Sequence, residues 1–555
     1  MAPRRSNKKQ QTKQAAPVSA AAPQQPAKEV ASEAVDALAA VPAMGFAATH
    51  AQLSGDVRGF LETVIAQAGS DATREHLVVH MHRGLQQMDT FLQQQHTDED
   101  GNELQSFEAV VARESDLWKD HVQQAKASED MGIQERKLQA TLQVNMKGLD
   151  LKAGRPGRPD DAVYEKSEYA RKYMPRGNFV AEWTSPSSGA TLHFPIIRAY
   201  RKFTGQEDDG ETKGVIGEEL LSKFFTKPKE QTRHVISTTK ENGEAGHLAV
   251  LKRSDGQYLF AMGSKNTHLV ALSLEDIDNA CRAGRKEGNN PYVAAGPIAQ
   301  ALMKMITSLS EEHRAWLCEF LWQTRMTASF EILCPSHQHV QLLDYIDEDT
   351  PVFYGFSLPS FTHMGGAEIC VNPVLPYELM RAIGVRTVEY KVVPFTAERY
   401  EQTLVDIKAS YQHEGAVNLF LDDAACVIGM EKFKTIWYVS LRAIREKAKA
   451  FCNKLHPRKA SKQPQSSAKV LADSQAQIQK RFVAIKVYLQ ISSDVAQKYT
   501  ELGQKFVEYL LEEQLSGDKS AEELKEVKHR VADLFPVVWK EFLGHTQLSD
   551  VVAAQ

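Results

Sequence analysis

One lysine in this sequence is placed as a nucleophile would be. Lys240 ends a stretch expected to be a β-strand, and Gly243 follows three residues later, where it permits a tight turn. An amine presented in this way can attack a phosphorus atom. The Lys-x-x-Gly pattern alone is weak evidence, because about two chance matches are expected at this composition. A second match occurs at residues 202–205.

Further charged segments lie around Lys240 in a fixed order. Each one alone has an ordinary explanation, such as a lysine in an exposed turn or a strand charge that faces solvent. Their joint order is what favours a shared site. In chain order the segments are Lys223-Phe224-Phe225-Thr226, Gly263-Ser264-Lys265-Asn266, Ser329-Phe330-Glu331-Ile332, Glu414-Gly415-Ala416-Val417 and Lys432-Phe433-Lys434.

Together with residues 240–243, these segments resemble motifs of the covalent nucleotidyltransferase superfamily, which includes polynucleotide ligases and capping enzymes. The sequence is most similar to ATP-dependent RNA ligases of the phage type and to the adenylyltransferase part of fungal tRNA ligases. Their Lys-Phe-Phe-Asn segment resembles residues 223–226. The resemblance covers roughly residues 190–440 and implies an α+β fold, with a core of antiparallel sheets flanked by helices.

The resemblance implies that Lys240 becomes covalently linked to AMP, with ATP and Mg²⁺ or Mn²⁺ as cofactors. A free lysine amine titrates near ~10.4 and is mostly protonated at neutral pH. Lys432, Lys434 and the metal ion would place positive charge beside it, so we expect the pKa of Lys240 to be lowered. Glu414 is expected to bind the metal, because Mg²⁺ takes one or two carboxylates with water and phosphate oxygens.

The remaining nucleotide contacts are implied by the same resemblance. Glu331 would accept a hydrogen bond from a ribose hydroxyl, and Lys223 and Lys265 would contact the nucleotide. An upstream arginine that reaches the ATP phosphates has two candidates, Arg198 and Arg201. We favour Arg198, because it directly follows an apolar, strand-like run.

Two positions depart from the pattern of the superfamily. Asn242 stands where Asp is most common, which keeps a turn-forming residue and removes a charge. After the Glu331 segment, RNA ligases usually read Pro-x-Asn-Arg-x-Val, whereas residues 335–340 read Pro-Ser-His-Gln-His-Val. The missing arginine suggests a changed substrate contact.

Two histidine pairs suggest metal sites, but neither is complete in the sequence. His80 and His82 straddle an expected helix, where two ligands on one face would be four residues apart. His337 and His339 would share a face of a strand, but no third ligand is evident. A zinc site is therefore not predicted.

Composition limits the other possibilities. The 555 residues carry 66 Lys+Arg and 71 Asp+Glu, a net charge of −5, which argues against a uniformly basic nucleic-acid binder. The six cysteines form no Cys-x-x-Cys pair, so reduced thiols in an intracellular protein, nuclear or cytoplasmic, are expected. No apolar run is long enough to span a membrane.

The composition and periodicity of the sequence change along the chain. Residues 1–50 are rich in Ala, Gln, Pro and Lys and should form a disordered basic tail. This tail could be a nuclear-import signal, an arm that contacts RNA, or a solvated segment without a function of its own. Residues 51–150 have helical spacing. Residues 160–455 mix short strands and helices and should form the nucleotidyltransferase domain. Residues 456–470 read as a linker, and residues 471–548 as an all-helical domain.

The predicted function is that of an ATP-dependent RNA ligase that joins 5′-phosphate and 3′-hydroxyl RNA ends, as in RNA repair or tRNA processing. DNA ligases and capping enzymes place an OB-type barrel after the last motif, whereas this chain has a helical end. A capping-type guanylyltransferase and an inactive RNA-binding scaffold of the same fold are the alternatives. No phosphate-binding kinase loop is present, so a separate enzyme would heal the RNA ends. The sequence does not indicate an oligomeric state.

Overall fold

The computed structural model describes most of the chain. The predicted tail and the predicted linker lie mostly outside the described residues. Within the described residues, no helix has the length and apolar character needed to cross a bilayer. All six cysteines are free thiols. The described residues are 45–155, 158–205, 217–286, 290–360, 366–455, 466–517 and 519–551.

Three α-helices open the described chain, as the helical spacing predicts. Leu61, Val64 and Ile65 form a buried face on the first of them. Ser106 begins the third, where its hydroxyl accepts a hydrogen bond from the backbone N–H of Ala109. The elements are α2 (Gly55–Ser70), η1 (Glu75–Leu77), α3 (Val78–Gln95) and α4 (Phe107–Ala127).

The helical prediction for residues 51–150 fails from residue 131 onward, where two β-strands form. They belong to an antiparallel sheet of order β1-β2-β3-β4, against which α4 packs through β4. Gly148 explains part of the difference, because a Cβ atom there would lie 2.2 Å from the ring of Phe179 on the neighbouring strand. Cross-strand packing therefore decides the local structure. The strands are β1 (Met131–Lys137), β2 (Met146–Ala153), β3 (Asn178–Thr184) and β4 (Thr191–Arg198).

Two further antiparallel sheets form the mixed region that the sequence predicted. One has the order β10-β9-β6-β7-β8 and the other the order β11-β5-β12-β13. The first consists of β6 (Glu244–Lys252), β7 (Tyr258–Ser264), β8 (Thr267–Ala271), β9 (Thr327–Leu333) and β10 (Thr350–Ser357). The second consists of β5 (His234–Lys240), β11 (Tyr390–Pro394), β12 (Gly415–Leu421) and β13 (Val427–Lys434).

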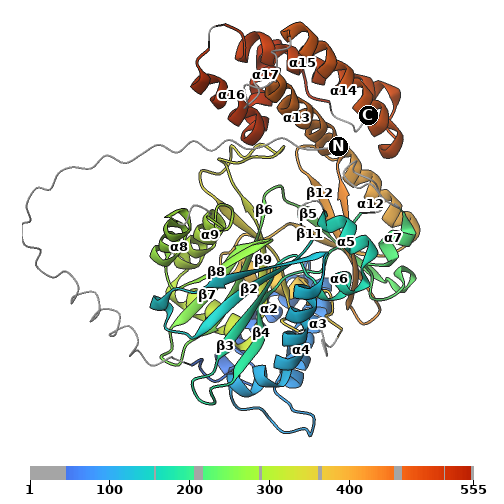
Figure 1. Ribbon diagram of the computed structural model, residues 1–555. Helices are drawn as coiled ribbons and strands as arrows, with labels where there is room; N and C mark the ends of the chain where they lie inside the picture. Colours follow the sequence, from blue (N-terminus) through green and yellow to red (C-terminus); the bar gives the residue numbers. More distant parts are fainter. Residues whose placement is uncertain are drawn as a thin grey trace, which may run out of the picture. The chain divides into compact units, whose positions relative to one another are not determined.

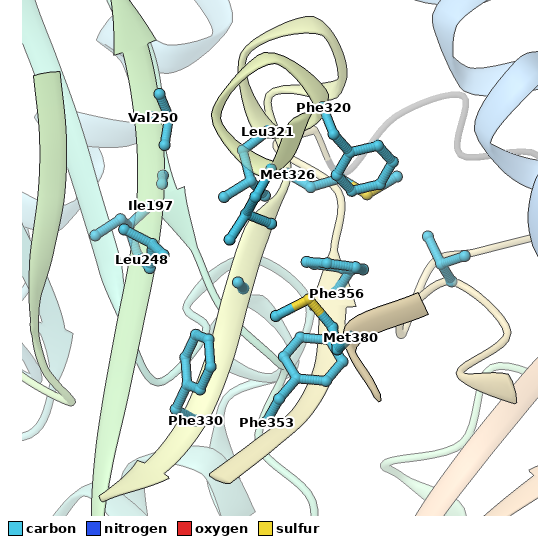
Figure 2. Packing of buried hydrophobic residues seen from close by; sticks show 14 of the residues in the cluster. Ile197, Leu248, Val250, Phe320, Leu321, Met326, Phe330, Phe353, Phe356 and Met380 are labelled. Carbon is cyan, nitrogen blue, oxygen red and sulfur yellow. The ribbon is translucent and has the colours of Figure 1, made fainter. Parts of the chain in front are cut away.

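Helices cover these sheets, and the main apolar core lies between them. In Figure 2, Phe330 of β9 and Phe353 of β10 point into this core, and their ring centroids are 5.5 Å apart. Alternation along β9 then turns Glu331 toward the opposite face. The helices of this region are α5 (Asp160–Lys166), α6 (Glu168–Tyr173), α7 (Glu218–Ser222), α8 (Leu274–Lys286), α9 (Ala295–Ser308), α10 (Glu311–Thr324), α11 (Val374–Ala382) and α12 (Ala397–Ala409).

The C-terminal part is helical and has its own apolar core. Its helices, coloured orange to red in Figure 1, gather in one body. Ser520 and Glu523 form a capping box, in which each side chain accepts a hydrogen bond from the backbone N–H of the other. The helices are α13 (Ile436–Leu455), α14 (Ser467–Leu489), α15 (Ser493–Tyr509), a π-turn at η4 (Leu510–Gln514), α16 (Ala521–Asp533) and α17 (Phe535–Thr546). The expected α+β fold with a helical C-terminal region is confirmed.

Candidate functional site

The register of the third sheet brings three of the predicted segments together. Gly415 at the start of β12 pairs with Lys240 at the end of β5 on one side and with Lys434 at the end of β13 on the other. Gly415 has φ +152°, and a Cβ atom there would lie 1.9 Å from the carbonyl oxygen of Phe433. Glycine is therefore required after Glu414 for the strands to approach this closely.

Gly243 serves the same purpose on the other side of the lysine. A Cβ atom there would lie 2.2 Å from the carbonyl oxygen of Ile332 on β9. Its backbone N–H donates a hydrogen bond of 3.0 Å to Oε1 of Glu331. The turn after Lys240 is thus held against the strand that carries Glu331, which links the two sheets at the site.

Six of the eight predicted site residues line one cavity of about 310 Å³. Alternation along β13 explains part of this set, because Lys432 and Lys434 face the cavity while Phe433 packs on the other side of the sheet against Tyr400. The six residues are Lys240, Lys265, Glu331, Glu414, Lys432 and Lys434.

The rest of the cavity has an apolar floor. Val417 pairs in register with Thr238 of β5 and with Lys432 of β13, and Leu419 pairs in the same way with Met430. All five side chains line the cavity. A hydrophobic floor beside several cations matches a ligand with a flat apolar base and a chain of phosphates.

The direction of the pKa shift at Lys240 differs from the prediction. Burial lowers the pKa of its ammonium, but the carboxylates of Glu414 and Glu331 outweigh burial and raise it. Nζ of Lys240 lies 2.9 Å from Oε1 of Glu414. The two acids therefore act on the amine more strongly than the lysines of β13 do, and the expected lowering of the pKa is wrong for the ligand-free chain.

The two acids have opposite pKa shifts. Burial raises the pKa of Glu331 to about 7, although Lys240 partly opposes this. Burial also raises the pKa of Glu414, but Lys240 and Lys434 outweigh it, and the net shift is downward. Glu414 is therefore a carboxylate at neutral pH, whereas Glu331 is close to its midpoint.

The donor set at this point fits a hard divalent cation. Glu414 and Glu331 both line the cavity and interact electrostatically with each other and with Lys240. Mg²⁺ prefers carboxylate oxygens and completes its shell with water and phosphate oxygens. The two carboxylates at the cavity wall can supply the carboxylate oxygens, and the cavity leaves room for water and phosphate oxygens.

Asn242 anchors the lysine-containing turn to two other segments. Its Nδ2 donates to Oε2 of Glu414 over 2.9 Å and to the hydroxyl of Tyr438 over 3.3 Å. Its Oδ1 accepts from the backbone N–H groups of Val340 and Gln341. Tyr438 is only 6% exposed, and its contact with the turn was not evident from the sequence.

The choice between the two upstream arginines is corrected by the structure. Arg198 is 1% exposed and points into the core, where Nη1 donates to the carbonyl oxygen of Leu358. Arg201 lines the cavity instead. Arg198 ends β4, so alternation turns its side chain inward, whereas Arg201 follows in the segment after the strand.

Lys223 is also misplaced by the prediction. It lies at the end of α7, is exposed, and has its Nζ 3.8 Å from Glu219. The neighbouring Phe225 packs against β13. A Cβ atom on Gly429 of that strand would lie only 2.2 Å from the Phe225 ring, so glycine is needed for the ring to pack this closely.

One basic residue of the cavity was missed by sequence reasoning. Arg176 lines the cavity and donates to Oδ2 of Asp160 over 2.9 Å. Lys265 donates to the same oxygen over 2.6 Å. Both Arg176 and Asp160 lie upstream of the segments with recognisable motifs. Asp160 of α5 reaches the cavity through its ion pair with Lys265 of the turn between β7 and β8, a contact that the sequence does not indicate.

The model of a domain of unknown function, DUF7920, matches residues 157–445. A search of curated proteins gave no match. Among solved structures, an archaeal ATP-dependent RNA ligase is similar with a TM-score of 0.34 and 13% identity, over 77% of this chain and 78% of that chain.

Two structures of Naegleria gruberi RNA ligase are similar as well, both of lysine-to-alanine mutants with ATP and Mn. One has a TM-score of 0.27 and 13% identity, over 46% of this chain and 64% of that chain. The other has a TM-score of 0.24 and 15% identity, over 38% of this chain and 52% of that chain.

Proposed function

The chain belongs to the DUF7920 family, a domain of unknown function, and we propose that its cavity is the active site of an ATP-dependent RNA ligase that works through a lysyl-AMP intermediate. One observation carries the proposal. Lys240 lies at the wall of a cavity with an apolar floor, paired with Glu414 and flanked by Lys432 and Lys434. A scaffold that only binds RNA has no physical reason to bring these groups together.

In the first step Lys240 attacks the α-phosphorus of ATP. The bond from Nζ to phosphorus forms, the bond from the α-phosphorus to the bridging oxygen breaks, and pyrophosphate leaves. The ammonium, whose Nζ lies 2.9 Å from Oε1 of Glu414, must first lose its proton to solvent water. Lys432 and Lys434 stabilise the charge on the phosphate oxygens.

The next two steps pass AMP to RNA and release it. The 5′-phosphate of one RNA end attacks the phosphorus of lysyl-AMP, which breaks the bond to Nζ and returns the amine. The 3′-hydroxyl of the other end then attacks that 5′-phosphate and expels AMP. Arg176, Arg201 and Lys265, which also line the cavity, are the groups that would hold the incoming phosphates.

The proposed cofactor is Mg²⁺ or Mn²⁺, held by Glu414. When bound, it would neutralise this carboxylate and the phosphate oxygens, and so weaken the negative charge that keeps the amine of Lys240 protonated. In its absence, the raised pKa of Lys240 keeps the nucleophile in its unreactive form. Glu331 is proposed to accept a hydrogen bond from a ribose hydroxyl.

The helical C-terminal part is the reason to propose RNA as the substrate. Residues 160–455 are the proposed adenylyltransferase domain and residues 471–548 a helical appendage. After β13 the described chain continues with α13 to α17 instead of the strands of an OB-type barrel. A helical body of this kind is suited to a structured RNA such as tRNA.

The test is covalent labelling of the full chain. We expect incubation with ATP labelled at the α-phosphate and Mg²⁺ to transfer label to the protein, and mass spectrometry to place AMP on Lys240. Lys240→Ala and Lys240→Arg should abolish labelling, while Lys480→Ala, an exposed lysine on α14, should not change it. Labelling by GTP in preference to ATP would replace the proposal with a capping-type guanylyltransferase. Absence of any nucleotide-dependent label would refute both.

Substrate class is tested separately with preformed ends. Labelled chain, freed of ATP, should seal RNA with a 5′-phosphate and a 3′-hydroxyl and release AMP. It should not seal 5′-hydroxyl RNA, because the second step then has no nucleophile. Equal sealing of nicked DNA would contradict the choice of RNA.

A further inference from the structure

A second cluster of ligating side chains lies outside the cavity. It contains Glu244, the first residue of β6, and His337 and His339 in the segment after β9. Nε2 of His339 lies 3.3 Å from Oε1 of Glu244, and Nε2 of His337 lies 3.9 Å from the same oxygen. The third ligand that the His-x-His pair lacks in the sequence is therefore supplied by a strand about 95 residues upstream.

The spacing of these atoms fits one small cation. Ligands that each lie about 2.0–2.1 Å from a tetrahedral Zn²⁺ ion are about 3.3 Å apart from one another. The ligand atoms of all three residues lie within 4.8 Å of one another. The two imidazole rings are nearly perpendicular, with centroids 5.3 Å apart, so neither ring blocks the nitrogen of the other.

An outer partner orients one of the rings. Nδ1 of His337 lies 3.4 Å from Oδ1 of Asp533, at the end of α16. An Nδ1–H that donates to this carboxylate leaves the lone pair of Nε2 directed at Glu244, as in carboxylate–histidine–zinc arrangements. Asp533 is held in turn by His529, whose Nδ1 is 2.7 Å from Oδ2 of Asp533.

We propose that Glu244, His337 and His339 bind one Zn²⁺ ion, with water in the fourth position and Asp533 as the outer partner of His337. Two imidazoles and one carboxylate favour Zn²⁺ over Mg²⁺ or Ca²⁺, which prefer oxygen ligands alone. The ligands are between 27% and 49% exposed, so the ion enters from solvent.

The site joins three parts of the chain. Glu244 comes directly after the Lys240 turn, the histidines belong to the segment whose backbone binds Asn242, and Asp533 belongs to the C-terminal helices. The backbone N–H of Gln338, between the histidines, also donates to the carbonyl oxygen of Asp533 over 2.6 Å. Bound zinc would fasten the C-terminal helices to the back of the lysine turn.

The test is zinc binding by the untagged full chain, which does not depend on the proposed ligase activity. After removal of metals with a chelator, a titration against a competing zinc dye should give one tight equivalent per chain, and Co²⁺ should give the visible absorption of a four-coordinate ion. Glu244→Gln and His339→Ala should each weaken binding at least about 100-fold, and Asp533→Asn about 10-fold. His82→Ala, an exposed histidine on α3, should change nothing.

A thermal readout complements the titration. Zinc should raise the unfolding temperature of the wild-type chain and of His82→Ala, but not that of Glu244→Gln, whose exposed side chain can be replaced without loss of folding. The proposal is overturned if the wild-type chain binds no tight zinc, if the three site variants bind it as well as wild type, or if Mg²⁺ at equal concentration displaces it.

Discussion

The side-chain amide of Asn242 bridges to the carboxylate of Glu414 over 2.9 Å, and both residues are almost fully buried, at 5% and 4% exposed. On its other side the amide oxygen accepts two backbone N–H groups, from Val340 and Gln341. The position thus requires a donor on one side and an acceptor on the other, which an ionised Asp does not offer. These contacts therefore favour Asn over Asp at position 242.

Asn242→Asp should therefore destabilise the chain. At pH 8 the new carboxylate faces Glu414 and loses the donated hydrogen bond, and we expect the free energy of unfolding to fall by about 2–4 kcal/mol. Near pH 5 the loss should be smaller, because a protonated carboxyl can donate again. Urea unfolding at both pH values measures the difference. Asn279→Asp, exposed on α8, is the control, and a loss that is independent of pH would contradict this account.

Glu331 should make stability depend on pH near neutrality. Its pKa is raised by burial to about 7, so the folded chain favours the protonated form. The stabilisation is fully present below the pKa of the unfolded chain, about 4.3, and is lost as pH rises through about 7. Glu331→Gln keeps an oxygen for the N–H of Gly243 and removes the charge. We expect it to be more stable than wild type at pH 8.5 by about 2–3 kcal/mol and equally stable at pH 4.

Denaturant unfolding across this pH range is the measurement for Glu331→Gln. Glu526→Gln, an exposed glutamate in α16, serves as the matched control and should show no such trend. A variant less stable than wild type at pH 8.5 would mean that the electrostatic attraction of Glu331 to Lys240 outweighs burial. Covalent labelling should fall in Glu331→Gln even where stability rises, because the proposed ribose contact is altered.

The sequence predicted the parts of the site that sit on regular strands. Lys432 and Lys434 alternate with Phe433, and strand periodicity alone turns both toward one face. The apolar pattern of α2 and the capping box of α16 are likewise local signals. Six of eight predicted site residues line the cavity, and each of the six lies in a strand, at its end or in the adjoining turn, where the sequence pattern is recognisable.

Contacts between distant segments could not be predicted from the sequence. Arg198 and Arg201 stand three residues apart, and only the end of β4 decides which one faces the core. Arg176 and Asp160 have no local pattern, and Glu244 becomes a partner of His339 only through the pairing of β6 with β9. The strands within residues 131–153 pair with each other and with β3, and the close approach of Phe179 to Gly148 is a contact that helical periodicity does not register.

Substitutions of Arg198 and Arg201 should have different effects, one on stability and the other on ATP binding. Arg201→Ala should raise the KM for ATP about tenfold or more, because it removes a cation from the cavity, with little change in unfolding temperature. Arg198→Ala should instead lower the free energy of unfolding by about 2–4 kcal/mol, because the side chain fills the core. Pyrophosphate release and thermal unfolding measure the two effects. The opposite assignment, with KM raised only by Arg198→Ala, would restore the sequence-based choice.

Asp160 holds two cavity cations at once, since its Oδ2 lies 2.9 Å from Arg176 and 2.6 Å from Lys265. Burial raises the pKa of Asp160, but the two cations outweigh it and lower it well below its usual value. The resulting stability is present above about pH 4 and lost as pH falls further. Asp160→Asn should therefore cost about 1–3 kcal/mol at pH 7, and the gap to wild type should narrow in acid denaturation below about pH 4.

The same substitution should strengthen nucleotide binding, because the phosphates no longer compete with a carboxylate for Arg176 and Lys265. We expect Asp160→Asn to lower the dissociation constant for ATP about 3–10-fold at low salt, where cation contacts are least screened. Asp161→Asn is the matched control: Asp161 pairs with Lys202, which does not line the cavity, and acts on Lys265 and Arg176 only through longer-range attraction, so stability should fall while ATP binding changes much less than in Asp160→Asn. Calorimetric titration with ATP measures both. An equal change in the two variants would indicate a general loosening of α5 instead of competition for the cavity cations.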